Sequence, residues 1–196
     1  ERAEGGNPET IVARARAAGI SHLYVRLGSS KKGFYAQGDL DRILPTAHAA
    51  GLKIVGWDFP YLADPAGDAA RAHAEITYAT RDGHRIDAFS ADIETGSEGV
   101  ALTAIAAEAY GARLRELVGA GYPLVATVPR PVPGKWFPYA EATRHFDAIA
   151  PMVYWMGNDP VTEVNAAIDA LAPLGKPIIP IGQAYDGAID GGPPGP

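Results

Sequence analysis

Two carboxylates, Asp92 and Glu94, close the apolar stretch Asp87–Glu94. If this stretch is a β-strand, residues two apart point to the same face, with Cα atoms about 6.6 Å apart. Two such carboxylates repel each other, so one holds its proton more tightly, as a general acid must. Glu94 could instead be a surface charge or cap a helix near Ser97. Asp92 lies within an apolar strand, where an unpaired charge is costly, and this favours a functional site.

Aromatic side chains gather near the ends of the expected strands. Sugar rings have apolar C–H faces that stack on aromatic rings, so a site lined this way suits a glycan. Trp57 and Trp155 could alternatively fill the top of a core, because buried aromatic side chains dominate cores. Together with the acids, the aromatic set predicts a carbohydrate cleft that includes Trp57, Tyr61, Trp136, Tyr154, Trp155 and Tyr185.

Other polar residues are candidates for binding substrate. Arg26 could pair with Asp92, hold a substrate carboxylate or form a structural salt bridge, and Gln183 could contact a sugar hydroxyl. The chain has no cysteine, and its five histidines form no His-x-x-x-His group, so neither a metal nor another cofactor is expected. No Gly-x-Ser-x-Gly motif is present, which argues against a serine hydrolase.

Strand-like and helix-like segments alternate along the chain. This pattern predicts parallel βαβ units and an α/β fold, a (β/α)8 TIM-type barrel. The segment 27–33 lacks the glycine spacing and the Gly-Lys-Ser/Thr ending of a phosphate loop, which disfavours a doubly wound sheet. Strands are expected at 21–27, 53–59, 86–94, 124–128, 148–155 and 176–182, and helices at 8–18, 39–50, 65–81, 97–120, 139–145 and 161–171.

Six strands are fewer than the eight of a closed barrel. The expected barrel therefore lacks its first and eighth strands, or a partner chain or flanking segment completes it. One domain is expected over residues 1–190, followed by a Gly/Pro-rich loop or linker at 191–196.

Composition narrows the possible partners. The 196 residues carry a formal net charge of −6 and no basic stripe, which argues against binding to nucleic acid. No apolar run reaches the roughly 18 residues of a membrane-spanning helix, so membrane insertion is not expected. No signal peptide is visible, but the chain begins without Met, as a mature or cut form would. The compartment stays open, with a secreted or wall-associated protein favoured.

The stretch Asp87-x-x-Ser90-x-Asp92-x-Glu94 resembles the Asp-x-x-Asp-x-Asp-x-Glu signature of family 18 glycoside hydrolases, the chitinases and their relatives. The resemblance implies that Glu94 is the catalytic acid and that Asp92 orients the substrate acetamido group, which attacks its own anomeric carbon. Ser90 departs from the signature. Met152-Val-Tyr154 is similar to a Met-x-Tyr motif on the sixth strand of that family.

Family 25 lysozymes are a second resemblance. Asp92-Ile-Glu94 is similar to the end of their fourth strand, and residues 49–59 resemble their Ala-x-x-Gly-x-x-x-Gly-x-Tyr-His-Phe motif, with Asp58 in place of the His that contacts substrate. Both resemblances imply a glycoside hydrolase acting on a β-linked N-acetylated glycan such as peptidoglycan or chitin. The alternative is a carbohydrate-binding barrel with weak or no catalysis. A phosphosugar isomerase or aldolase is disfavoured, because no strand places a lysine at the mouth.

Overall fold

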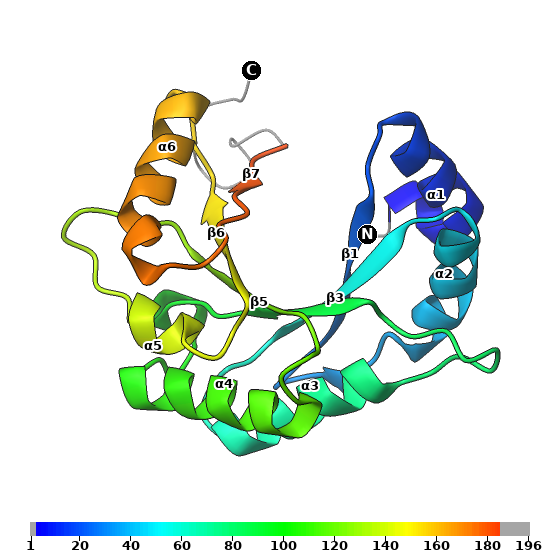
Figure 1. Cartoon of the computed structure of the whole chain (residues 1–196), viewed down its shortest axis with the longest axis horizontal. Coiled ribbons are helices and arrows are strands. Elements are labelled where there is room, and N and C mark those ends of the chain that lie inside the picture. The colour runs from blue at the N-terminus through cyan, green and yellow to red at the C-terminus, as the bar shows by residue number, and fades with distance from the viewer. Residues whose placement is uncertain (1–2, 185–196) are drawn as a thin grey trace.

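The computed structural model describes residues 3–184, in which one curled sheet forms an incomplete TIM-type barrel (Figure 1). The strand order is β2-β1-β3-β4-β5-β6-β7, and every pairing is parallel except that of β2 with β1. The six parallel strands match the six expected from the sequence. The strands are β1 (His22–Ser29), β2 (Gly33–Phe34), β3 (Lys53–Phe59), β4 (Ala88–Asp92), β5 (Leu124–Pro129), β6 (Ala148–Val153) and β7 (Ile181–Gly182).

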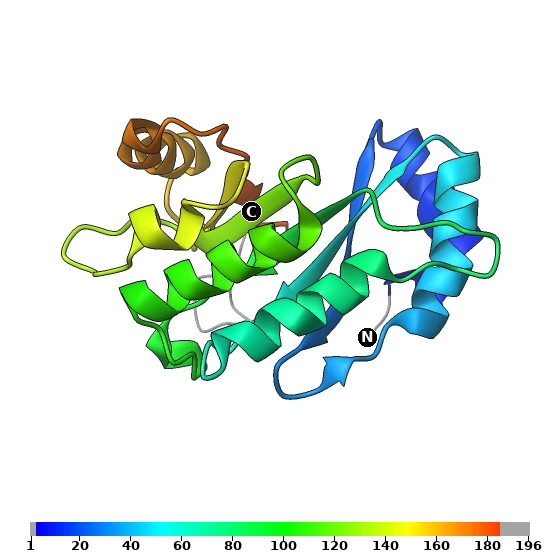
Figure 2. The ribbon, with the colours of Figure 1, turned by 60° about the horizontal axis from the view of Figure 1, so that its bottom comes forward.

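The helices lie outside the curl, on the convex face of the sheet (Figure 2). They are α1 (Pro8–Ala17), α2 (Gln37–Ala49), α3 (Pro65–Thr77), α4 (Ala104–Val118), α5 (Tyr139–Thr143) and α6 (Pro160–Leu171), with short 3-10 turns at Ala3–Gly6, Gly96–Glu98 and Ala172–Leu174. Among residues 3–184, no helix is long and apolar enough to cross a membrane.

Strand parity separates two apolar regions. The main core lies between the sheet and the helices and contains Leu27, Ile54 and Phe89, none of which is exposed to solvent. A smaller cluster of Val125, Ala148 and Ala150, packed with Ile181, lies apart from that core. Because side chains alternate along each strand, the smaller cluster belongs to the concave face.

Local signals explain where three helices begin. Asn7, Asp64 and Asp159 each precede a proline and accept a hydrogen bond from the backbone N–H three residues later, at 2.9, 3.0 and 2.7 Å. Such residues satisfy N–H groups that the first turn leaves unpaired, and proline loses nothing at the first helical position. The start predicted at Asn7-Pro8 is confirmed.

Several expected boundaries differ from the structure. Thr103, rather than Ser97, caps α4, and its Oγ1 accepts from the N–H of Ala106 at 3.0 Å. Helix α3 ends at Thr77 instead of Arg81, since Tyr78 turns away to pack edge-on against Phe34 at 5.5 Å.

Three strand predictions were also inexact. Strand β4 ends at Asp92, so Glu94 lies in the loop that follows. Strand β7 has only two residues, and β6 ends at Val153. After β1, the chain turns back as the short antiparallel strand β2, which was not among the expected strands. The expected domain end at 190 and the linker at 191–196 lie outside the described residues.

The amino ends of the strands are held by two similar aspartates. Asp87 accepts hydrogen bonds from the N–H of Ile54 at 2.9 Å and from Lys53 Nζ at 2.8 Å. Asp147 accepts from the N–H of Leu124 at 2.8 Å and pairs with Arg115 at 2.7 Å. Each aspartate ties its own strand to the preceding one, so Asp87, the first residue of the chitinase-like signature, has a structural role.

Candidate functional site

Asp92 is the last residue of β4 and lies at the carboxyl end of a central strand. Its pairing with Thr127 and the pairing of Trp57 with Ser90 place these four residues on one face of the sheet. Active sites of barrel enzymes lie at this end of the strands. The parity predicted from the sequence is therefore confirmed for Asp92.

The carboxyl group of Asp92 is poorly satisfied. Its Oδ1 is buried and has no hydrogen-bond partner among residues 3–184. Burial raises the pKa of Asp92 to about 7; the negative charge of Glu94 acts in the same direction, and the positive charge of Arg26 opposes it. This carboxyl therefore holds its proton to a higher pH than an ordinary aspartate does, and in its protonated form it can donate a hydrogen bond.

Asp92 opens onto a cavity of about 340 Å³ on the concave face. Four predicted site residues meet there, namely Trp57, Asp92, Met152 and Tyr154. The remaining lining residues, Tyr24, Thr127 and Ile181, carry no motif that predicts them from the sequence. Strand alternation could have identified Tyr24, because it lies two residues before Arg26 on β1 and so shares its face.

Glu94 follows β4 by two residues and is half-buried in the loop. Burial raises the pKa of Glu94, a backbone hydrogen bond from Thr95 lowers it, and the negative charge of Glu98 raises it. Glu94 is not among the residues that line the 340 Å³ cavity, but its charge acts on Asp92. The two acids therefore form an electrostatically linked pair at the mouth.

Beneath Asp92, Ser90 occupies the position that an aspartate holds in the chitinase-like signature. Ser90 is fully buried, and its Oγ lies 2.7 Å from Oγ1 of Thr127 on β5. The two neutral hydroxyl groups are hydrogen-bonded to each other, and neither carries a charge. The charge at this level of the site thus rests on Asp92 and Glu94.

Arg26 and Trp57 form a cation–π pair on the same face. The guanidinium carbon of Arg26 lies 4.7 Å from the ring centroid of Trp57. The structure records no ion pair between Arg26 and Asp92, although the positive charge of Arg26 lowers the pKa of Asp92. Of the three roles considered for Arg26, a structural salt bridge is not seen among residues 3–184.

Asp58 lies on the opposite face of the sheet from Trp57. Its side chain is fully buried, and it pairs with Arg71 of α3 at 2.6 Å. The prediction that Asp58 contacts substrate therefore conflicts with the structure. The physical reason is strand parity: if Trp57 faces the cleft, the next residue must face the helices.

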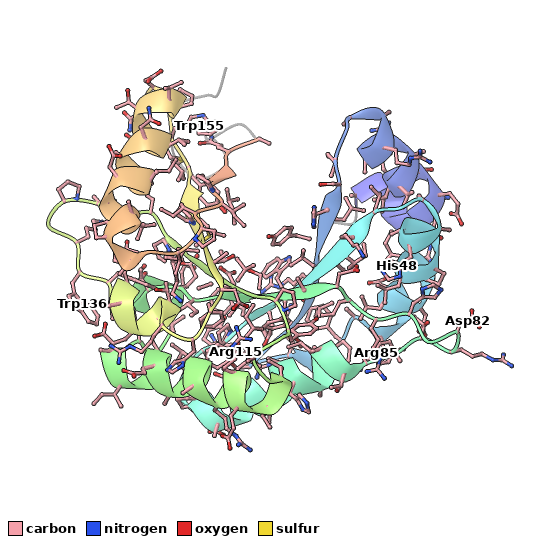
Figure 3. The ribbon with its side chains drawn as sticks, viewed as in Figure 1. His48, Asp82, Arg85, Arg115, Trp136 and Trp155 are labelled. Carbon is pink, nitrogen blue, oxygen red and sulfur yellow. The ribbon has the colours of Figure 1, made fainter. Side chains whose placement is uncertain are left out.

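Two other predicted residues lie away from the cavity. Trp136 is 67% exposed and lies in the loop before α5, outside the curled sheet (Figure 3). Trp155 follows β6 and packs its ring against the backbone of Gly182, where an added Cβ would come within 3.1 Å of the ring. Neither tryptophan lines the 340 Å³ cavity.

The remaining predicted residues occupy loops. Tyr61 follows β3, with Lys31 Nζ 3.8 Å from its ring centroid and Phe59 at 4.7 Å. Gln183 is buried, and its side-chain oxygen accepts a hydrogen bond from the N–H of Met156 at 3.0 Å. Tyr185 lies outside the described residues. Within residues 3–184, no three His, Asp or Glu side chains are grouped to hold a metal ion.

Several solved structures have a fold similar to that of this chain. The chain aligns with three xylanase and α-amylase inhibitor proteins at TM-scores of 0.53, 0.54 and 0.55, with 14–15% sequence identity. The alignments cover 83–87% of this chain and 69–72% of those proteins, one of which comes from Scadoxus multiflorus. What the chain shares with these proteins is the TIM-type barrel fold. Identity at this level establishes the fold alone, and the sequence matches no family model and no curated protein.

Proposed function

We propose that the concave face binds a β-linked N-acetylated glycan, such as peptidoglycan or chitin, and hydrolyses a glycosidic bond in it. The observation that supports this most directly is the buried Oδ1 of Asp92, which has no hydrogen-bond partner among residues 3–184 and belongs to a carboxyl at a cavity lined by Tyr24, Trp57 and Tyr154. A ligand that hydrogen-bonds to Asp92 would remove the cost of leaving this oxygen unsatisfied. The aromatic rings would stack against its sugar rings.

In the proposed reaction, Glu94 gives its proton to the leaving glycosidic oxygen as the bond to the anomeric carbon breaks. The acetamido oxygen of the same sugar attacks that carbon, and Asp92 orients the acetamido group by a hydrogen bond. Water, deprotonated by Glu94, then opens the cyclic intermediate and restores the acid. Since Asp92 is the only acid among the described cavity residues, a substrate-assisted route is preferred to one with a protein nucleophile.

The structural neighbours add support of a general kind. One xylanase–α-amylase inhibitor protein of this fold was crystallised with the disaccharide trehalose. A saccharide therefore binds to at least one protein that shares the fold. The N-acetylated substrate class rests on the resemblance of the Asp92–Glu94 motif to the two hydrolase families.

Substitution of the proposed acid tests the proposal. We expect Glu94→Gln to lower the release of reducing ends from chitin oligomers or peptidoglycan by at least about 100-fold, because the amide cannot donate the proton. Glu116→Gln on the exposed face of α4 is the matched control and should leave the rate unchanged. Equal rates for Glu94→Gln and the unmutated protein would refute the acid role.

A carbohydrate-binding barrel without catalysis is the second candidate. The neutral Ser90–Thr127 pair favours it, because the chitinase-like signature has an acid at Ser90. The same assay separates the two candidates. If the unmutated protein binds the oligomers in calorimetry but releases no reducing ends, the binding function stands and hydrolysis is excluded. If it neither binds nor cleaves them, both are refuted.

A further inference from the structure

A second cavity adjoins the one at Asp92. It has a volume of about 430 Å³ and lies at the outer edge of β1, where residues from both faces of that strand and from helices α1 and α2 line it. Tyr24 and Trp57 line both cavities, so the two cavities adjoin at these residues. A glycan chain with one sugar at Asp92 would therefore meet the second cavity at a neighbouring sugar.

The charge of this second cavity differs from that of the first. Arg26 and Arg42 both line it, and Asp39 is the acid in its described lining. The described lining of this cavity therefore carries more positive than negative charge, although the whole chain has a net charge of −6. The rest of the lining is mainly apolar, with Ile11, Leu23, Val25 and Ile43 among its members.

The guanidinium of Arg26 has hydrogen-bond donors that no described residue uses. It makes no hydrogen bond or ion pair with any residue in the described part of the chain, and it is exposed, with its guanidinium on the Trp57 ring. Arg42 uses Nη2 to donate to the carbonyl of Gly6 at 2.7 Å, and its other nitrogens make no recorded bond to residues 3–184. A guanidinium has five N–H donors in a planar fork that matches a carboxylate.

We infer that this second cavity is a subsite for a carboxylate carried by the glycan on a short apolar linker. Arg26 binds the carboxylate by paired hydrogen bonds, Arg42 adds positive charge, and the aliphatic side chains contact the linker. This inference rests on the proposed function and narrows it. A carboxylate-bearing N-acetylated polymer, the class to which peptidoglycan belongs, is the substrate, and the neutral polymer chitin is the weaker ligand.

The experiment compares two tetrasaccharides of equal length by calorimetry. One is the neutral N-acetylglucosamine tetramer, and the other alternates N-acetylglucosamine with N-acetylmuramic acid, which carries a lactyl carboxylate. Binding is measured in Glu94→Gln, to limit turnover, alone and combined with Arg26→Met or Arg42→Met. Methionine keeps the unbranched stem and removes the charge. Arg113→Met, on the exposed surface of α4, is the matched control.

We expect the acidic tetrasaccharide to bind about tenfold or more tightly than the neutral one, and high salt to reduce the ratio. Arg26→Met should bring the ratio close to one, Arg42→Met should lower it partially, and Arg113→Met should preserve it. A ratio of one before substitution, or a ratio that survives Arg26→Met, overturns the acidic subsite while the proposed function stands. Binding of neither ligand overturns the proposed function and the subsite together.

Discussion

At the level of single residues, the side chain of Asp92 destabilises the folded state. A buried oxygen without a partner is unfavourable. The neighbouring Ser90–Thr127 pair shows that this region of the sheet can satisfy its polar groups internally. The proposed glycan would supply the missing partner of Asp92 and remove this cost.

Substitution of Asp92 should therefore raise stability while lowering function. The pKa of Asp92 is about 7 in the fold, against its ordinary value of 3.8, so between these pH values the native state holds a proton that the unfolded state has released. The contribution of Asp92 to the free energy of unfolding therefore falls as the pH rises from 3.8 to about 7, and it stays low at higher pH. We expect Asp92→Asn to be more stable by roughly 1–3 kcal/mol at pH 8 and equal at pH 4, measured by urea unfolding.

Two observations would contradict this account. Asp82→Asn, in an exposed turn (Figure 3), is the matched control and should show no such pH-dependent gain. If Asp92→Asn is destabilised at both pH values, the carboxyl has a structural role. If it gains stability and still binds and cleaves glycan normally, Asp92 is not part of the site.

Strand alternation indicates which face of the sheet a residue occupies, but it holds only within a strand, and Glu94 lies beyond the end of β4. Alternation placed Asp92 on the inner face, and Trp57 shares the same cavity. Asp58 was assigned to the site by a family motif, although its position next to Trp57 requires the opposite face. Trp136 lies in a loop, where alternation gives no information about direction.

At the level of elements, a buried polar network joins α3 to the sheet. Arg71 donates to Asp58 at 2.6 Å and to Asp68 at 2.7 Å, and all three side chains are largely buried. Asp68 also accepts from the N–H of Leu62 at 2.9 Å and from Ser30 Oγ at 2.6 Å. The network therefore fixes the loop that carries Tyr61 after β3.

Removing the arginine should strongly destabilise the fold. Arg71→Met leaves two buried carboxylates without their cation, and we expect a loss of about 3–5 kcal/mol in the free energy of unfolding at neutral pH. Denaturant unfolding measures it. Arg113→Met removes an exposed pair on α4 and should cost less than about 1 kcal/mol. Equal losses for the two variants would show that the buried network does not stabilise the fold.

The start of α4 gives a second prediction for this scale. Thr103→Ala removes the side chain that accepts from the N–H of Ala106, and we expect a loss of about 1 kcal/mol. Thr103→Ser keeps the acceptor and should restore most of that loss in thermal or denaturant unfolding. Both Ser97 and Thr103 are suitable capping residues, so the sequence alone could not decide between them. A loss for Ser97→Ala that equals that for Thr103→Ala would contradict the observed boundary.

For the whole molecule, the number of parallel strands and the helix positions followed from the alternating pattern, but the closure of the sheet did not. Parallel pairing requires crossovers, and the sequence shows six strands joined in this way. A local pattern within one strand does not show which segment pairs with the outer edge of the first or last strand of the sheet. The sequence could therefore predict the missing strands but not what lies against β1 and β7.

Open edges should be visible in hydrogen exchange. Among residues 3–184, strand β1 is paired with β3 along its length. On its other side it pairs with β2 at Gly28 and Ser29, and the Leu27 carbonyl accepts a hydrogen bond from the N–H of Tyr35 at 3.1 Å. An edge strand presents unpaired N–H groups, so we expect amides in residues 22–27 to exchange faster than those of β4 and β5, which are paired on both sides. Exchange measured by mass spectrometry at low and high protein concentration tests this. Slow exchange at 22–27 that appears only at high concentration would show that a second copy covers the edge. Slow exchange at both concentrations, in a protein that remains monomeric by light scattering, would contradict an open edge at β1.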